Sequence, residues 1–172
     1  MGFKMIHGFS KVLLGAGFAL ALSANSASAR FNIVYRFKNV QDGRAASALI
    51  VDKAGIFYGT TPIGGTASKG TVYKLTPDGA KTTLYDFADA DSGAVPLARL
   101  LRDKQGNLYG TTQFTNVSGD VGGTVFKLSP DGHETVLHRF TANDAAGYTP
   151  KSELIADKSG NLYGTTAHGN GI

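Results

Sequence analysis

Residues 106–112 read Gly-Asn-Leu-Tyr-Gly-Thr-Thr, and this stretch decides the fold because close copies of it occur twice more in the chain. Gly-Ile-Phe-Tyr-Gly-Thr-Thr occupies residues 55–61, and Gly-Asn-Leu-Tyr-Gly-Thr-Thr occurs again at residues 160–166. A period of about 50 residues indicates stacked copies of one supersecondary unit. The shared tyrosine of the three copies is Tyr58, Tyr109 and Tyr163.

A short apolar strand and a turn precede each copy of this motif. An aspartate ends the strand and a glycine follows three residues later, which is typical of a hairpin. The carboxylate can accept hydrogen bonds from the turn amides, and glycine tolerates the positive φ that the turn needs. We therefore interpret Asp52, Asp103 and Asp157 as turn formers. The alternative is calcium ligation, which would need more oxygen ligands nearby.

A second motif follows each of the first two copies after a glycine-rich connection. Residues 70–79 and 123–132 share the pattern Gly-Thr-Val-aromatic-Lys-Leu-(Thr or Ser)-Pro-Asp-Gly. Pro-Asp-Gly predicts a tight turn, because proline fixes φ and glycine supplies a left-handed exit. The strand after the turn ends in a phenylalanine, which recurs as Phe37, Phe87 and Phe140. Strands that are apolar on both faces indicate sheets covered on both sides.

The sequence thus predicts an all-β protein of four-stranded antiparallel repeats, each of about 50 residues. The predicted repeats span about 48–87, 99–140 and 153–172, the last of them truncated, and residues 31–37 are predicted to be the closing strand of a preceding unit. Such sheets stacked radially form β-propellers, so we expect a partial propeller with two complete units plus partial ones. A β-solenoid is the main alternative.

A closed propeller needs at least ~4 blades, which is more than this sequence supplies. We therefore expect either a fragment of a longer repeat protein or a protomer whose copies complete one ring. The third repeat breaks off part-way, and this favours the fragment.

The first 29 residues predict a secretory signal peptide, so the mature protein is expected to be exported to the periplasm, the cell surface or the medium. Lys4 and Lys11 precede an apolar run at residues 12–22, and Ala-Ser-Ala at 27–29 offers a cleavage site. The run is shorter than the ~20 residues of a membrane span, so no integral span is expected after cleavage. Cleavage lowers the formal charge from +4 to +2, which does not suggest a nucleic-acid partner.

The two motifs in this order resemble the bacterial GloVer-type tandem repeats of exported "choice-of-anchor" proteins, and the resemblance covers residues 31–172. It implies an exported, propeller-like repeat protein, in some members tethered by a C-terminal sorting or anchor segment. It carries over no enzymatic activity and no catalytic residues. The sequence departs from the family in having few repeats and no such anchor, which again suggests truncation.

Two groups of residues are candidates for contact with a partner. The repeated tyrosines are expected to pack one sheet on the next with their hydroxyls hydrogen-bonded, and the alternative is a set of aromatic platforms for sugar. The loops after the tyrosine motifs differ between repeats, and in repeat folds such variation gathers on a face that often binds. Their polar side chains could either bind a polar ligand or merely be solvated, namely Gln113, Asn116, Asp120, His168 and Asn170.

No residue is predicted to be catalytic or to bind a cofactor or metal. Phosphate-loop and nucleophile-elbow motifs are absent, and residues 89–93 begin like a calcium loop but lack its later acidic residue. We therefore expect an exported, non-enzymatic binding or scaffold module. The sequence does not identify its partner, and an extracellular glycan and an extracellular protein are the candidates. A propeller enzyme acting on extracellular polysaccharide and a lectin-like oligomer are the alternatives.

Overall fold

The computed structural model describes residues 33–89, 91–115 and 122–169. Contacts divide the chain into two parts, Met1–Val34 and Tyr35–Ile172. All strands of the described residues lie in the part Tyr35–Ile172, and the following description applies to that part. The predicted signal peptide and three predicted ligands, Asn116, Asp120 and Asn170, lie outside the described residues. Across the described ranges, no helix could span a bilayer.

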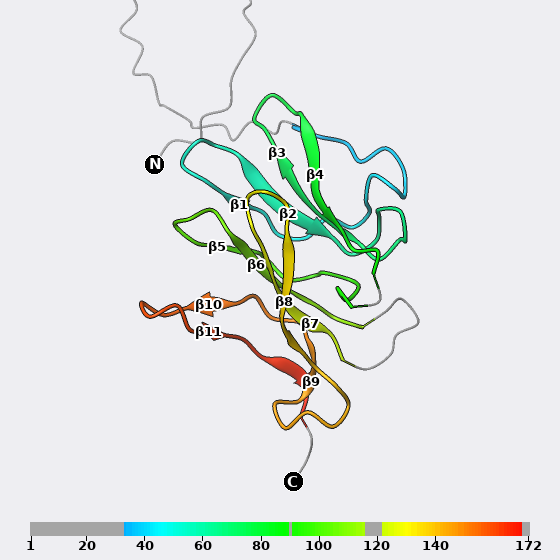
Figure 1. The fold of residues 1–172 in the computed structure, drawn as a ribbon. Helices are drawn as coiled ribbons and strands as arrows, with labels where there is room; N and C mark the ends of the chain where they lie inside the picture. The colour runs from blue at the N-terminus through cyan, green and yellow to red at the C-terminus, as the bar shows by residue number, and fades with distance from the viewer. Residues whose placement is uncertain (1–32, 90, 116–121, 170–172) are drawn as a thin grey trace, which may run out of the picture. The chain divides into compact units, whose positions relative to one another are not determined.

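Two four-stranded antiparallel sheets confirm the all-β prediction and the repeat unit (Figure 1). The first sheet has the order β1 (Ile50–Val51), β2 (Phe57–Thr61), β3 (Thr71–Leu75) and β4 (Lys81–Asp86). The second has β5 (Leu101–Arg102), β6 (Leu108–Thr112), β7 (Thr124–Leu128) and β8 (Glu134–Arg139). Both sheets shift register at the same place, between Val72 and Tyr73 in one and Val125 and Phe126 in the other. The two sheets are therefore copies of one unit.

A third unit carries the first half of the repeat. It contains β9 (Tyr148–Pro150), β10 (Ile155–Ala156), β11 (Leu162–Tyr163) and β12 (Thr166–His168), with β10 paired to β11 and β12 paired to β9. The β9–β12 pairing was not predicted. At the equivalent place in the other two units, the described residues form the isolated bridges Arg44↔Ile63 and Ala94↔Phe114.

The predicted closing strand at residues 31–37 is wrong for the residues described, since 33–37 form no strand. A strand needs a neighbour to pair with, and within the described ranges no earlier strand precedes this segment. Its aromatic residues nevertheless pack as in a complete unit. The Phe37 ring lies edge-on to Tyr73 with centroids 5.5 Å apart, and Tyr35 lies 5.3 Å from Phe37.

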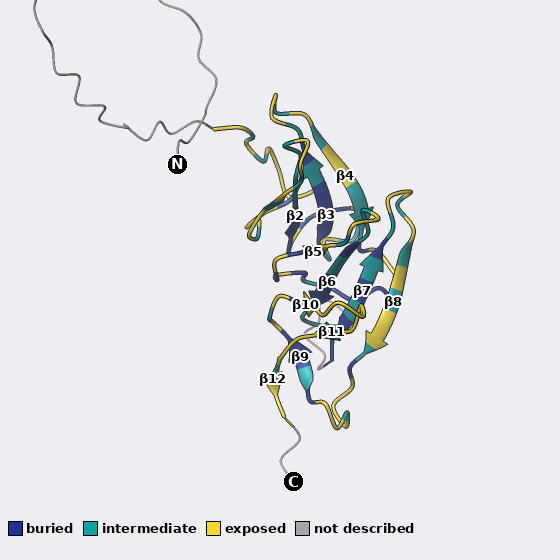
Figure 2. Ribbon diagram, turned by 90° about the vertical axis from the view of Figure 1, so that its left-hand side faces the viewer, coloured by how far each residue is buried: buried dark blue, intermediate teal, exposed yellow. Residues whose placement is uncertain are grey.

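One hydrophobic core joins the first two sheets. Its buried residues are Val72, Phe87, Leu100, Leu108, Phe126 and Leu128. Phe87 follows β4 and its ring lies 5.2 Å from that of Phe126 on β7, so the aromatic residue after one sheet covers the third strand of the next. Figure 2 shows β2, β3, β6 and β7 largely buried and parts of β4 and β8 exposed. This stacking is consistent with the expected partial propeller.

The glycine of the Tyr-Gly-Thr-Thr motif is explained by a ring that lies across it. A Cβ atom on Gly110 would stand 2.6 Å from Cζ of Phe126, and one on Gly59 would stand 2.8 Å from the hydroxyl oxygen of Tyr73. Both contacts are too short for a side chain, so only glycine fits beneath the ring. At Gly164 the nearest atom is Cδ2 of Leu154, at 2.8 Å, and no ring is close.

The two threonines of the motif have different partners. The first donates a hydrogen bond to the next unit, from Thr60 to the Pro96 carbonyl at 3.0 Å and from Thr111 to the Ser152 carbonyl at 3.4 Å. The second pairs with a threonine of the neighbouring strand. These hydroxyl pairs are Thr61 with Thr71 and Thr112 with Thr124, both at 2.8 Å.

A left-handed backbone residue also recurs, although no residue type recurs with it. Ala45, Val95 and Thr149 have φ of 56°, 61° and 60°. Each directly follows a bridge residue, which is Arg44, Ala94 or Tyr148. That bridge residue pairs with the residue two positions after the second motif threonine of its unit, namely Ile63, Phe114 or His168.

Candidate binding site

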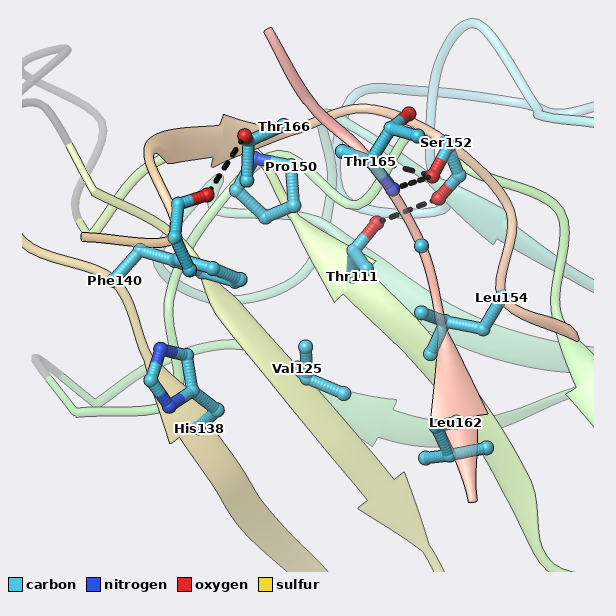
Figure 3. Close-up of a pocket in the computed structure, with 12 residues that line it drawn as sticks. Thr111, Val125, His138, Phe140, Pro150, Ser152, Leu154, Leu162, Thr165 and Thr166 are labelled. Atoms are coloured by element: carbon cyan, nitrogen blue, oxygen red, sulfur yellow. Dashed lines mark hydrogen bonds between the residues drawn. The ribbon is translucent and has the colours of Figure 1, made fainter. Parts of the chain in front are cut away.

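A cavity of about 540 Å³ lies between the second sheet and the third unit (Figure 3). Its apolar lining comes from Val125 on β7, Phe140 after β8, Pro150 on β9, Leu154 before β10 and Leu162 on β11. Figure 3 shows Phe140 and His138 on one side, Leu154 and Leu162 on the other, and Val125 between them. This volume falls within the ~300–1,000 Å³ of ligand pockets.

Hydrogen bonds within the protein engage the polar groups at the rim. The Thr111 hydroxyl donates to the Ser152 carbonyl, and the Thr165 amide donates to the Ser152 hydroxyl at 2.7 Å. The Thr166 hydroxyl donates to the Ala146 carbonyl at 3.0 Å. These groups already have partners, so the cavity presents mainly its apolar lining to an occupant.

The rim also carries one histidine–aspartate pair. Nε2 of His138 lies 2.8 Å from Oδ2 of Asp144, and the ring of His138 packs edge-on against Phe140 with centroids 4.5 Å apart. The Ala146 amide and then His138 hold the pKa of Asp144 below its ordinary value. Asp144 is thus an ionised group at neutral pH that fixes the histidine ring.

The same arrangement exists, filled, between the first two sheets. Tyr85 and Phe87 there correspond to His138 and Phe140, with ring centroids 5.0 Å apart. Leu100 and Leu108 correspond to Leu154 and Leu162, and they pack in one core with Phe126 and Leu128 of β7. Within the described part of the third unit, no strand equivalent to β7 occupies this position. Leu154 and Leu162 therefore line the cavity at the places where Leu100 and Leu108 contact the shared core of the first two sheets.

A comparison with known protein families agrees with this repeated architecture. The profile described as the Gloeobacter/Verrucomicrobia repeat matches residues 12–172. The chain belongs to the Gloeobacter/Verrucomicrobia repeat family. The GloVer-type resemblance is thereby confirmed. No curated protein matches the chain.

In this member of the Gloeobacter/Verrucomicrobia repeat family, the predicted turn aspartates accept hydrogen bonds from their turns. Oδ1 of Asp52 accepts from the amides of Ala54 and Ile56 at 2.9 and 3.0 Å. Oδ1 of Asp103 accepts from the Asn107 amide at 2.8 Å, and Asp157 repeats this contact with Asn161 at 2.9 Å. The repeat thus places an acceptor inside each of these three hairpins.

Each repeated tyrosine donates its hydroxyl to the aspartate of its own unit, a pairing that sequence reasoning missed. The distances to Oδ2 are 3.1 Å for Tyr58, 3.1 Å for Tyr109 and 3.0 Å for Tyr163. A constant separation of six residues between aspartate and tyrosine was the available signal. Tyr58 also packs against the core, and Cζ of Arg102 lies over the Tyr58 ring, 5.4 Å from the ring centroid. Tyr163, in contrast, is 51% exposed.

Two of the predicted loop ligands are described, and neither lines the cavity. The backbone amide of Gln113 donates a hydrogen bond to the Val95 carbonyl at 3.1 Å. The His168 ring stacks on that of Tyr148, with ring centroids 5.0 Å apart. Sequence reasoning missed the cavity residues because it looked for polar loops. Alignment of Leu154 and Leu162 with Leu100 and Leu108 could have found them.

One acidic side chain breaks the repeat symmetry. Lys81 in the first sheet pairs with Asp42 at 2.9 Å, and Asp42 also accepts from the Tyr35 hydroxyl. The equivalent of Lys81 in the second sheet is Glu134, whose Oε1 is buried and has no hydrogen-bond partner among the described residues. Burial raises the pKa of Glu134. Over the described ranges, no three histidine, aspartate or glutamate side chains are grouped to hold a metal ion.

Proposed function

We propose that this member of the repeat family is an exported binding or scaffold module that acts by docking a partner and not by catalysis. The observation that carries the proposal is the cavity beside the third unit, which is lined by the apolar side chains of Val125, Leu154 and Leu162. Open apolar concavities of this kind are typical of binding sites. The signal-like residues 1–29 support export.

The chemistry around the cavity favours binding. Its hydroxyls take part in hydrogen bonds to the protein's own backbone, and its one titratable pair, His138 with Asp144, orients a ring against Phe140. An apolar partner would bury this lining, and each apolar Å² removed from water contributes about 25 cal/mol.

The test uses a small aromatic probe, p-cresol, followed by methyl NMR of the purified full chain. Saturable shifts are expected for methyls of Val125, Leu154 and Leu162, because these side chains line the cavity. Leu162→Gln should weaken the binding, whereas the matched change Leu137→Gln, at a residue 46% exposed on β8, should leave it unchanged. Equal binding by both variants would contradict the proposal.

The unsymmetrical Glu134 gives the polysaccharide-acting alternative its one specific observation, since a raised pKa suits a general acid. Incubation with a panel of bacterial polysaccharides tests it. Release of reducing ends that disappears in Glu134→Gln would establish an enzyme and overturn the binding proposal. We expect no release.

A further inference from the structure

We propose that a second cavity, between the β1–β2 and β5–β6 turns, binds the carboxylate of a uronic-acid sugar in an acidic extracellular polysaccharide. This cavity measures about 580 Å³, and its lining consists of Asp52, Lys53, Ala54, Arg102, Asp103 and Lys104. Both turns belong to complete four-stranded sheets, so the cavity does not depend on the third unit. The inference rests on the proposed export, which brings the chain to such glycans, and is otherwise independent of the apolar cavity.

Arg102 is the residue of this cavity that breaks the repeat. The equivalent positions of the first and third units hold Val51 and Ala156. All three residues end the first strand of their unit. The strand forms with valine or alanine there, so the repeated fold does not require the charge of Arg102.

Neighbours on two sides hold the Arg102 guanidinium in place. Its Cζ lies 5.4 Å from the ring centroid of Tyr58, in the preceding unit. On the other side, a Cβ on Gly106 would stand only 3.3 Å from Nη2 of Arg102. The arginine side chain nevertheless remains 33% exposed. A positioned guanidinium that solvent still reaches loses little freedom when it binds an anion.

The protein leaves the charge of Arg102 only partly compensated. Nη2 lies 3.9 Å from Oδ2 of Asp52, whereas a charge-assisted hydrogen bond measures about 2.7–2.9 Å. Asp52 is instead satisfied by its own hairpin, from the amides of Ala54 and Ile56 and the hydroxyl of Tyr58. Burial by itself would raise the pKa of Asp52, but these hydrogen bonds hold it below its ordinary value, with Arg102 as a smaller contributor. The guanidinium is therefore able to serve a second carboxylate.

The remaining groups of the lining favour an anion that carries hydroxyls. The lining has three cationic side chains and two carboxylates, namely Lys53, Arg102, Lys104, Asp52 and Asp103. Oδ2 of Asp103 already accepts from the Asn107 side-chain amide at 2.6 Å and from the Tyr109 hydroxyl at 3.1 Å.

A sugar acid matches both the shape and the chemistry of this lining. The planar fork of Arg102 can donate two parallel hydrogen bonds to one carboxylate. The ammonium groups of Lys53 and Lys104 are donors that suit sugar hydroxyl oxygens. A volume of about 580 Å³ is also far larger than a bare carboxylate and falls within the ~300–1,000 Å³ of ligand pockets.

The experiment is a calorimetric titration of the purified full chain with trigalacturonate at low ionic strength. Saturable binding is expected, and added salt should weaken it because salt screens exposed charges. The methyl ester of the same trisaccharide keeps the sugars and removes the charge. It should bind at least about tenfold more weakly, since hydrogen bonds to charged groups are the stronger ones.

The matched protein variants are Arg102→Ala and Arg99→Ala, which remove the same charge. Arg99 is 52% exposed and does not line the cavity. Arg102→Ala should lower the affinity for trigalacturonate by about tenfold, whereas Arg99→Ala should leave it unchanged. Arg102→Lys should give an intermediate affinity, because an ammonium group keeps the charge and lacks the fork.

Four results would overturn the inference: no saturable binding of trigalacturonate, equal binding of its methyl ester, equal affinities of Arg102→Ala and Arg99→Ala, or equally tight binding of inorganic phosphate. The last would mean that any small anion is accepted. The ester comparison needs no protein variant, so it stands even if Arg102→Ala fails to fold. Loss of p-cresol binding would remove the proposed role of the apolar cavity alone, and loss of trigalacturonate binding would remove this inference alone.

Discussion

Gly110 illustrates how a single missing side chain fixes the packing of a whole sheet, because the ring of Phe126 occupies the place of its Cβ. We expect Gly110→Ala to destabilise the protein by about 1–3 kcal/mol, since a fully buried ring must move. Urea unfolding followed by circular dichroism measures the change. The control is Gly169→Ala, and an equal midpoint for both variants would show that the ring contact does not constrain residue 110.

Asp103 predicts a pH dependence of stability. Burial by itself would raise its pKa, but hydrogen bonds from Asn107 and Tyr109 outweigh burial and hold the pKa of Asp103 below its ordinary value. A lowered pKa stabilises the folded state above the unfolded value of about 3.9, and this stability is lost as pH falls through the folded pKa.

Asp103→Asn should therefore lower the unfolding midpoint at pH 7, and the gap to wild type should narrow toward pH 2. Thermal unfolding across this range measures it. Asp91→Asn is the control, because that side chain is 93% exposed. A gap that stays constant with pH would mean that Asp103 contributes through packing alone.

Glu134 predicts the opposite sign. Burial raises the pKa of Glu134 above 4.5, so the folded state disfavours its charged form. Its favourable contribution is present at acid pH and is lost as pH rises through the folded pKa. Glu134→Gln should consequently be more stable than wild type at pH 7 and equal to it near pH 3. Chemical unfolding at the two pH values tests this, and a variant that is less stable at pH 7 would refute it.

At the level of strands, the paired threonines stabilise the contact between β6 and β7. Thr112→Val removes the acceptor of the buried Thr124 amide, and an unsatisfied buried group costs about 1–3 kcal/mol. We expect that loss in urea unfolding. Thr82→Val, at an exposed position on β4, is the β-branched control. A smaller loss for Thr112→Val than for Thr82→Val would contradict the role of the pair.

Hairpins were predictable from sequence because their signals are local. Pro-Asp-Gly and the turn aspartates fix where a strand reverses, whatever the rest of the chain does. The strand predicted at 31–37 and the unpredicted β9–β12 pairing were misjudged because a strand exists only beside a partner. Phe37 packs on Tyr73 as its equivalent Phe87 packs on Phe126, although Phe37 lies in no strand. Sequence periodicity cannot distinguish a residue that packs in this way within a strand from one that packs outside a strand.

At the scale of the whole molecule, the three units should differ in how readily they open. Sheets β1–β4 and β5–β8 share one core, whereas Ile155 and Tyr163 of the third unit are 62% and 51% exposed. Regions with few buried contacts open locally more often. Hydrogen exchange should therefore be faster for the amides of β10 and β11 than for those of β6 and β7. Uniform protection of all these strands would contradict this.

The fold was predictable from sequence to a greater extent than the candidate site. Repetition of the motifs around Tyr58, Tyr109 and Tyr163 is sufficient to locate the repeats and their hairpins. The cavity is lined by residues of two different units, among them Leu154 and Leu162 of the third. The sequence of one repeat does not show how it packs against the next. Polar loop residues such as Gln113 were predicted as ligands instead, because polar residue types can be read from a sequence and a cavity cannot.

The left-handed residues Ala45, Val95 and Thr149 show that the units share a positive φ at a position where they share no residue type. A search that scores residue identity would pass over this position, although it recurs as faithfully as the tyrosine. Backbone torsions therefore align the units of such a chain at a position where their residue types differ. They also mark where an engineer could place glycine at no steric cost.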